Sequence, residues 1–106
     1  MADISKLPKP VELAYVKIEP SSGVLDTSRS PVVIYHGIFS NKESWTAIGK
    51  EIADQTKRVV YCFDVRDHGD SPFTSEFIFQ AMISDMVNFL NEHTISKALF
   101  LGHSLG

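Results

Sequence analysis

The stretch that decides the fold is Ala98-Leu99-Phe100-Leu101-Gly102-His103-Ser104-Leu105-Gly106. Its last five residues have the pattern G-x-S-x-G, and they directly follow a run of four apolar residues. A buried parallel strand followed by a serine with glycine on both sides is typical of a sharp strand-to-helix turn that exposes the serine hydroxyl. A plain glycine-serine turn after a core strand is the alternative interpretation. The strand context favours the first interpretation, so we predict that Ser104 is a nucleophile.

The residues beside Ser104 indicate how such a nucleophile works. The backbone N–H of Leu105 would point into the site and donate to the oxyanion that forms when Ser104 attacks a carbonyl group. Gly102 and Gly106 are the small residues that the turn needs on each side of the serine. The chain as given stops at Gly106, before the helix whose N-terminal dipole would add to this stabilisation.

Three earlier segments have the patterns of strands. The β-branched run 31–35 and the run 58–63 are typical of strands buried on both faces of a parallel sheet. Residues 11–18 alternate in polarity, which predicts a half-buried strand that ends at Glu19-Pro20. Residues 1–10 have no periodicity and are interpreted as an N-terminal arm.

Two segments between these strands have helical periodicity. The capping-box pattern Ser40-Asn41-Lys42-Glu43 begins the first helix, of about three turns, and the second is predicted over residues 75–93. The residues expected to face the sheet are Trp45, Ile48, Ile52 and Ala53 in the first helix and Ile78, Met82, Met86, Phe89 and Leu90 in the second. Strands that alternate with helices predict an α/β fold with a mainly parallel sheet. If the strand at 31–35 lies between its two successors, right-handed crossovers place the two helices on opposite faces.

Composition limits the function classes. With 106 residues the chain is long enough for at most one small domain, and its net charge of -3 gives no basic surface for nucleic acid. The single cysteine, Cys62, lies in an apolar run, which predicts a reduced, buried thiol in an intracellular protein. No apolar run approaches the roughly 18 residues of a membrane span, and no presequence is visible. The sequence has no cluster of metal ligands, and we expect neither a metal nor a cofactor.

Three loops with distinctive residues follow the predicted parallel strands. They are His36-Gly37, Asp64 to Ser71, and Gly102 to Gly106. Ligands of such sheets bind beyond the carboxyl ends of the strands, so we expect the three loops to meet at one site. His36-Gly37 by itself would also fit a simple strand exit. The charged residues of the second loop fit either a catalytic or a structural role.

In this order and at these intervals, Val33-Ile34-Tyr35-His36-Gly37, Phe63 to Ser71 and Gly102 to Gly106 resemble the N-terminal part of the α/β-hydrolase superfamily. Within it, the tract Asp-Val-Arg-Asp-His-Gly-Asp-Ser-Pro from Asp64 to Pro72, together with Trp45 and Asp85, is similar to the alpha/beta-hydrolase domain-containing protein 11 group. That group consists of mitochondrial serine hydrolases of the diacylglycerol lipase type. The resemblance implies that residues 11–106 are the incomplete N-terminal portion of one α/β-hydrolase domain, truncated after the nucleophile-elbow strand, and that the protein is mitochondrial.

The resemblance also implies a role for individual residues. Ser104 is the nucleophile and the N–H of Leu105 is one oxyanion donor. The second donor is the N–H of Ile38, with that of Phe39 as the alternative, and Gly37 allows the tight turn that aims it. The family uses the loop after the strand at 58–63 to brace the rim beside the elbow. The residues of this structural rim loop are Asp64, Arg66 and His68.

In this family the acid and the histidine of the catalytic triad follow the serine in chain order, so both are expected after residue 106. The parent protein is therefore predicted to be a serine hydrolase of carboxylic esters, acylglycerols among them, that works through an acyl-enzyme. Its expected partner is a small-molecule acyl ester or a lipid. Residues 1–106 alone are predicted to be inactive. The alternatives are a non-catalytic α/β-hydrolase-fold binding protein, a truncated product, or a thioesterase.

Overall fold

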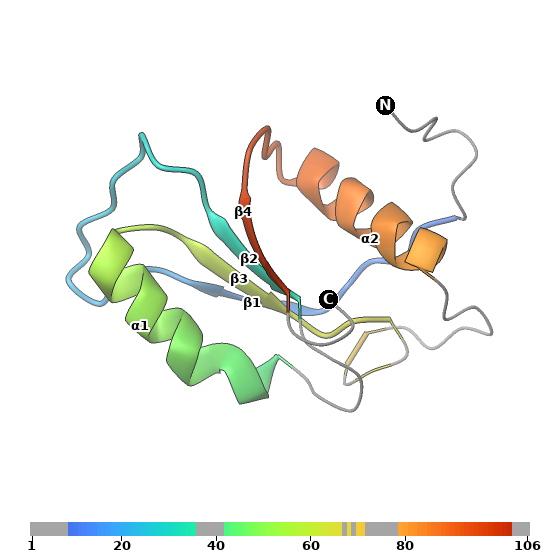
Figure 1. The fold of residues 1–106 in the computed structure, drawn as a ribbon, viewed down its shortest axis with the longest axis horizontal. Helices are drawn as coiled ribbons and strands as arrows, with labels where there is room; N and C mark the ends of the chain where they lie inside the picture. The colour runs from blue at the N-terminus through green and yellow to red at the C-terminus, as the bar shows by residue number, and fades with distance from the viewer. Residues whose placement is uncertain (1–8, 36–41, 67, 69, 72–78, 103–106) are drawn as a thin grey trace.

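A mixed sheet runs through the part of the chain that the computed structural model describes, residues 9–35, 42–66, 68, 70–71 and 79–102 (Figure 1). The strands are β1 (Tyr15–Ile18), β2 (Val32–Tyr35), β3 (Val60–Phe63) and β4 (Leu99–Gly102). The strand order in the sheet is β1-β3-β2-β4. Strand β2 pairs in parallel with both β3 and β4, whereas β1 pairs with β3 in the antiparallel direction. The expected α/β fold with a mainly parallel sheet is confirmed.

Two helices cover opposite faces of this sheet. A short 3-10 helix, η2 (Glu43–Trp45), leads into α1 (Thr46–Thr56), and α2 (Phe79–Glu92) follows β3. Because β2 lies between β3 and β4, right-handed crossovers require the two helices to lie on different faces, and Figure 1 shows the sheet between them. Among the residues that the structure describes, neither helix is long and apolar enough to cross a membrane.

Each face of the sheet has its own apolar cluster. On the α1 side, side chains of the strands pack with Ala53 of the helix, and on the α2 side they pack with Met82, Met86 and Phe89. Successive residues of β2 and β3 alternate between the two clusters, as the strand geometry requires. The strand residues facing α1 are Ile18, Val32, Ile34, Val60 and Cys62, and those facing α2 are Val33, Tyr35, Tyr61 and Phe63. Cys62 is fully buried and is not in a disulfide.

The inward stripe of α1 differs from the predicted one at one position. Trp45, Ile52 and Ala53 face the sheet as expected, but Ile48 is 47% exposed. Gly49 faces the sheet instead, and a Cβ there would stand 2.8 Å from Cδ1 of Ile18 and 3.1 Å from Sγ of Cys62. The absence of a side chain at Gly49 lets the helix approach the sheet closely. That approach centres the stripe on Gly49 and turns Ile48 toward solvent.

The predicted strand at 11–18 is shorter in the structure, and only Tyr15–Ile18 pairs with β3. Before Tyr15, two backbone N–H groups bind side chains of distant segments, and the carbonyl of Ala14 accepts the N–H of Asp64, just after β3, at 2.9 Å. The N–H of Val11 donates to Oδ1 of Asp85 at 2.8 Å, and the N–H of Ala14 donates to Oγ of Ser71 at 2.9 Å. These groups are therefore unavailable for a ladder, and this moves the start of the strand to Tyr15.

The backbone conformation of Lys57 explains where α1 ends. Helix α1 ends where Lys57 adopts the left-handed conformation (φ 58°) and donates its N–H to the carbonyl of Ala53. Helix α2 lies within the predicted range 75–93, of which residues 75–78 lie outside the described part. Ser40, the proposed cap of the first helix, also lies outside it. His93 follows α2, and its Nδ1 is 3.0 Å from the carbonyl oxygen of Phe89.

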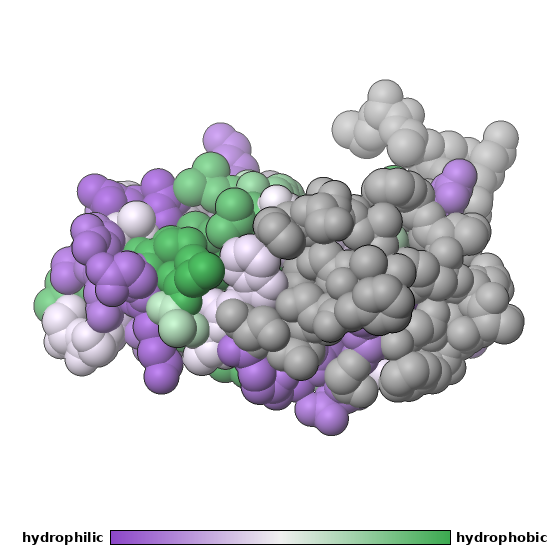
Figure 2. All heavy atoms as spheres, turned by 60° about the horizontal axis from the view of Figure 1, so that its bottom comes forward, coloured by the Kyte–Doolittle hydropathy of each residue, from purple (hydrophilic) through white to green (hydrophobic). Residues whose placement is uncertain are grey.

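Strand β4 lies at the edge of the sheet, and its apolar side chains are in contact with solvent. Leu99, Phe100 and Leu101 are 50%, 58% and 38% exposed. The predicted parallel pairing of this strand with β2 is confirmed. Figure 2 shows apolar surface bordered by hydrophilic residues on one face of the molecule.

Candidate active site

The carboxyl ends of β2 and β4 lie side by side. In the parallel register of these strands, Tyr35 pairs with Gly102, so both strands end at the same level of the sheet. The segments that continue from these ends, 36–41 and 103–106, lie outside the described residues. The proposed roles of Gly37, Ile38, Phe39, Ser104, Leu105 and Gly106 therefore remain predictions, whereas Gly102 is in place as the last residue of β4.

The loop after β3 reaches the same rim and begins with a buried carboxylate. Asp64 is fully buried. Its Oδ1 accepts the backbone N–H of Lys42 at 2.8 Å, and its Oδ2 accepts Nζ of Lys42 at 2.6 Å and the N–H of Asp70 at 2.8 Å. Asp64 therefore joins the residue that precedes η2 to the loop after β3.

The hydrogen bonds between Asp64 and its partners shift the pKa values of both Asp64 and Lys42. Burial by itself would raise the pKa of Asp64, but the hydrogen bonds from the Lys42 ammonium and from the N–H groups of Asp70 and Lys42 outweigh it, so the pKa of Asp64 lies below its ordinary value. Hydrogen bonds to Asp64 and Asp70 raise the pKa of Lys42. Both partners are therefore charged at neutral pH.

Arg66 forms a second buried ion pair two residues further along. Its Nε lies 2.7 Å from Oδ2 of Asp85, and its Nη2 lies 2.7 Å from Oδ1 of the same carboxylate. Arg66 is 2% exposed and Asp85 is fully buried. The pair links the loop after β3 to the middle of α2, and the N–H of Val11 adds the N-terminal segment to the same carboxylate.

His68 and Ser71 complete the described part of this loop. Nδ1 of the half-buried His68 lies 3.0 Å from the carbonyl oxygen of Arg66, and the carbonyl of His68 accepts the N–H of Ser71. The hydroxyl of Ser71 donates to the carbonyl of Asp64 and accepts from the N–H of Ala14. Each of the loop residues named above, Asp64, Arg66, His68 and Ser71, thus forms a hydrogen bond or an ion pair with another residue of the protein. This geometry is the one that a structural rim loop requires, and the role itself stays an interpretation.

Sequence reasoning missed the part that Lys42 plays. The sequence places Lys42 in a capping-box pattern, and no local feature indicates that its side chain is 9% exposed and paired with residues 22 and 28 positions away. The carboxylates of the later Asp-Val-Arg-Asp-His-Gly-Asp tract were the available signal, because one of them needs a cation once it is buried.

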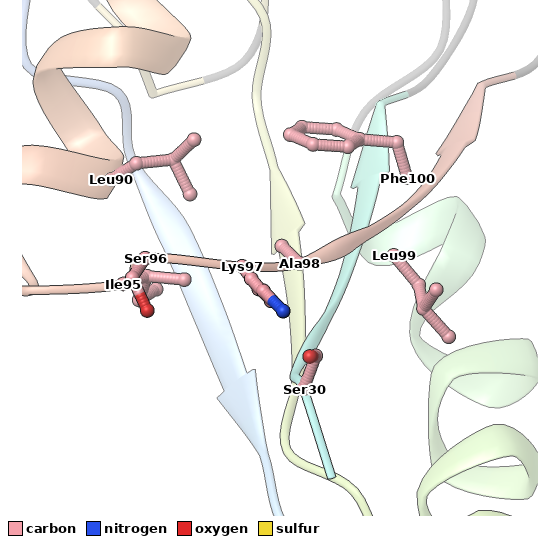
Figure 3. A pocket seen from close by; sticks show the side chains of 8 residues that line it. All are labelled: Ser30, Leu90, Ile95, Ser96, Lys97, Ala98, Leu99 and Phe100. Atoms are coloured by element: carbon pink, nitrogen blue, oxygen red, sulfur yellow. The ribbon is translucent and has the colours of Figure 1, made fainter.

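An open pocket of about 400 Å³ lies away from this rim, at the amino end of β4. Figure 3 shows Leu90 of α2 and Phe100 of β4 pointing toward the same space, and Ser30 at the lower edge. Lys97 and Ala98 line it where β4 begins. Among the described residues, its lining includes no member of the loop after β3.

The family is evident from comparison with known proteins. A family model described as alpha/beta hydrolase fold matches residues 30–106. The chain is 35% identical over 98 residues to an abhydrolase domain-containing protein of Schizosaccharomyces pombe, covering 92% of this chain and 35% of the relative. It is 32% identical over 105 residues to the sn-1-specific diacylglycerol lipase ABHD11 of Danio rerio, covering 99% of this chain and 32% of the relative.

Two further similarities concern acyl chemistry. A probable alcohol acetyltransferase of Wickerhamomyces anomalus is 31% identical over 100 residues, covering 91% of this chain and 29% of the relative. Among solved structures, an esterase from a marine microorganism superposes with a TM-score of 0.78 at 28% identity, over 91% of this chain and 33% of the esterase. The chain thus spans about a third of the length of the proteins it matches. With a family model that matches most of its length and a sheet of the expected order, the chain belongs to the alpha/beta hydrolase fold family.

Proposed function

We propose that a full-length protein carrying these residues is a serine hydrolase of carboxylic esters with Ser104 as its nucleophile. The observation that supports this most directly is the pairing of Tyr35 with Gly102. Strands β2 and β4, which end directly before His36 and His103, are neighbours and end at the same level of the sheet. A nucleophile and an oxyanion-binding loop must approach one carbonyl group, and this arrangement of strands allows it.

The proposed reaction proceeds through an acyl-enzyme. A histidine, expected after Ser104 in the chain order of the family, accepts the hydroxyl proton as Oγ attacks the ester carbonyl. The N–H groups of Leu105 and of Ile38, or of Phe39 in the alternative, donate to the oxyanion. The histidine then protonates the leaving alcohol. In the second half, water attacks the acyl-enzyme with the same histidine as base, and the acid is released.

Acylglycerols are the first natural substrates to test. The support is the name of one relative, a diacylglycerol lipase, and that of a monoacylglycerol lipase from Paleococcus ferrophilus, which superposes with a TM-score of 0.64 at 26% identity. A thioesterase would use the same residues, so acyl thioesters belong in the same substrate panel. A mitochondrial location is proposed from the same resemblance, and a fluorescent fusion of the full-length protein would test it.

Acyl transfer to an alcohol is a second candidate, supported by the relative named as an alcohol acetyltransferase. The same acyl-enzyme would form, and an alcohol would replace water in the second half of the reaction. The ratio of new ester to free acid, measured with ethanol as a competing acceptor, separates transfer from hydrolysis. If only acid forms over a wide range of ethanol concentration, the transferase candidate is wrong.

Replacement of Ser104 tests the proposal. We expect the full-length protein to hydrolyse short-chain aryl esters and Ser104→Ala to lose this turnover by several orders of magnitude. Ser96→Ala, which changes an exposed serine before β4, is the matched control and should retain full activity. Both variants should give the same circular dichroism spectrum as the wild type. Turnover that survives in Ser104→Ala would refute the assignment, and a wild-type protein without activity on any ester or thioester would favour the non-catalytic alternative.

A further inference from the structure

Strand β1 lies at one edge of the sheet and has a side to which another strand can bind. Among the residues that the structure describes, it pairs with β3 alone. The carbonyl of Ala14 accepts the N–H of Asp64, so Ala14 directs its backbone groups toward β3. Because these directions alternate along an antiparallel strand, Tyr15, Lys17 and Glu19 direct their N–H and C=O groups away from β3. These outward groups form the free edge of β1.

Two opposite charges stand on the free edge. Lys17 and Glu19 lie on the same face of the extended chain, with Nζ of the lysine 3.6 Å from Oε1 of the glutamate. Their side chains are 49% and 60% exposed, so both charges are available to a further partner. A lone lysine on an edge strand keeps other strands away. Here a carboxylate accompanies the ammonium, so the free edge attracts a strand that presents the same two charges in the opposite order.

A second copy of the chain presents the charges in that order when the two β1 strands run antiparallel. If Ile18 faces Ile18 of the second copy, Lys17 of each copy faces Glu19 of the other. The outward groups of Lys17 and Glu19 then form hydrogen-bonded pairs of the new ladder. Pro20 faces Val16 of the other copy at a position without hydrogen bonds, so its missing N–H removes none from the ladder.

Other registers of this ladder are less favourable. A register in which Lys17 faces Lys17 of the second copy places like charges opposite each other, which is destabilising. A shift by a single residue would set outward groups against groups that already point toward β3, so the hydrogen bonds could not form. A strand of an unrelated protein would match the two charges only by coincidence. The charge order therefore favours a second copy of this chain and one register.

An open groove beside the free edge leaves room for the second copy. It has a volume of about 440 Å³ and is lined by β1 and by residues of α1, among them Thr46, Lys50 and Asp54. Oδ1 of Asp54 accepts the N–H of Ser21 at 2.7 Å and its hydroxyl at 2.9 Å, which holds the chain just after the free edge. The contact is isologous, so each copy offers the same edge and the same groove to the other.

We propose that the full-length protein forms a twofold-symmetric dimer in which the β1 strands of two copies pair in the antiparallel direction about Ile18 and join the two sheets into one. The inference depends on β1 and its surroundings and does not rest on the proposed function. A ladder this short buries less than a standard interface of about 1,200 to 2,000 Å². The dimer is therefore expected to be weak, with a dissociation constant of roughly 1 to 100 µM.

Sedimentation velocity of the full-length protein measures the association, and charge reversal tests its origin. Lys17→Glu should raise the dissociation constant about tenfold or more, because two repelling pairs replace two attracting ones. Adding Glu19→Lys reverses both charges and restores the opposite pairs, which should return the constant to within about threefold of the wild-type value. Lys97→Glu makes the same charge change at an exposed position before β4 and is the matched control, expected to leave the constant unchanged.

Cysteine cross-linking tests the register. An equal mixture of Lys17→Cys and Glu19→Cys proteins places the two thiols at facing positions, where Cα atoms of a hydrogen-bonded pair are about 5.5 Å apart, within the range of a disulfide. Either variant alone places its two cysteines two residues apart along the ladder, beyond the roughly 7 Å at which a disulfide closes. The mixture should therefore cross-link about tenfold faster or more than either variant alone. The native Cys62 is fully buried and does not compete.

Each result supports or overturns the dimer. A concentration-dependent dimer that Lys17→Glu weakens and the double reversal restores, with cross-linking confined to the mixture, supports it. A full-length protein that stays monomeric at about 1 mM, well above the weakest expected constant, would overturn it. A dimer with the same constant in Lys17→Glu, or cross-linking as fast in Lys17→Cys alone as in the mixture, would show a different interface or register and would overturn it as well.

Discussion

Arg66 and Asp85 form a bidentate ion pair with both N···O distances at 2.7 Å, and both residues are buried. The pair connects the loop after β3 to α2. We expect Arg66→Met to lower the free energy of unfolding by about 3 to 5 kcal/mol, because it leaves the Asp85 carboxylate buried without its cation. Turnover per folded molecule of the full-length protein should change little. Urea denaturation and active-site titration together measure both quantities.

Two controls make this result interpretable. Arg29→Met removes a cation from the exposed pair with Asp26 and should have a much smaller effect. Adding Asp85→Leu to Arg66→Met should recover part of the lost stability, because the uncompensated charge is gone. An unchanged melting temperature combined with a collapse of turnover would instead make Arg66 part of the catalytic machinery.

The low pKa of Asp64 predicts how a Lys42→Met variant responds to pH. The folded wild type keeps this carboxylate ionised to a lower pH than the unfolded chain does, because an aspartate of the unfolded chain has a pKa of about 3.9. The stability from the pair is therefore fully present above that range and is lost as the pH falls through the folded pKa. The stability difference between wild type and Lys42→Met should be largest near neutral pH and shrink toward about pH 3.

Urea unfolding of both proteins at several pH values checks this expectation. The raised pKa of Lys42 does not interfere, because stability linked to that group is present below its unfolded value of about 10.4 and is lost only as the pH rises through the folded value. A difference that stays constant from acid to neutral pH would show that Lys42 contributes through packing alone.

Cys62 should be unreactive in the folded protein. It lies in the core cluster beside α1 with no exposed surface, and burial raises the pKa of its thiol to about 11. At pH 8 the thiolate fraction is small and the sulfur is inaccessible, so a disulfide reagent should modify it only after urea unfolding. Ser96→Cys gives an exposed thiol in the same protein as a positive control. Modification of Cys62 as fast as of the introduced cysteine would mean that α1 opens readily.

Much of the sheet could be predicted because its signals are local. The runs around Ile34 and Tyr61 are apolar on both faces, and the glycine-flanked serine after Leu101 identified the strand that pairs with β2. Opposite faces for α1 and α2 followed from the handedness of crossovers once β2 was taken as the middle strand.

The errors and omissions concern interactions between distant residues. The start of β1 was placed too early because the acceptors for Val11 and Ala14 are side chains 74 and 57 positions away. The burial of Lys42 depends on a carboxylate 22 positions away. Ile48 was assigned to the sheet on periodicity alone, whereas Gly49 can approach more closely because it lacks a side chain. Hydrophobic patterns contain no information on such contacts.

Expression of residues 1–106 alone gives the last prediction. Leu99, Phe100 and Leu101 are between 38% and 58% exposed on an edge strand, which is an apolar surface of the kind that binds hydrophobic dyes and promotes association. We expect this polypeptide to bind such a dye, and Phe100→Ser to reduce the signal more than Ile48→Ser, which changes an exposed residue on α1. We also expect no labelling of Ser104 by a fluorophosphonate, because the activating histidine is expected later in the chain order of the family. A cooperatively melting, dye-free polypeptide that takes the label at Ser104 would contradict both expectations and would point to a histidine within residues 1–106, such as His68, as the base.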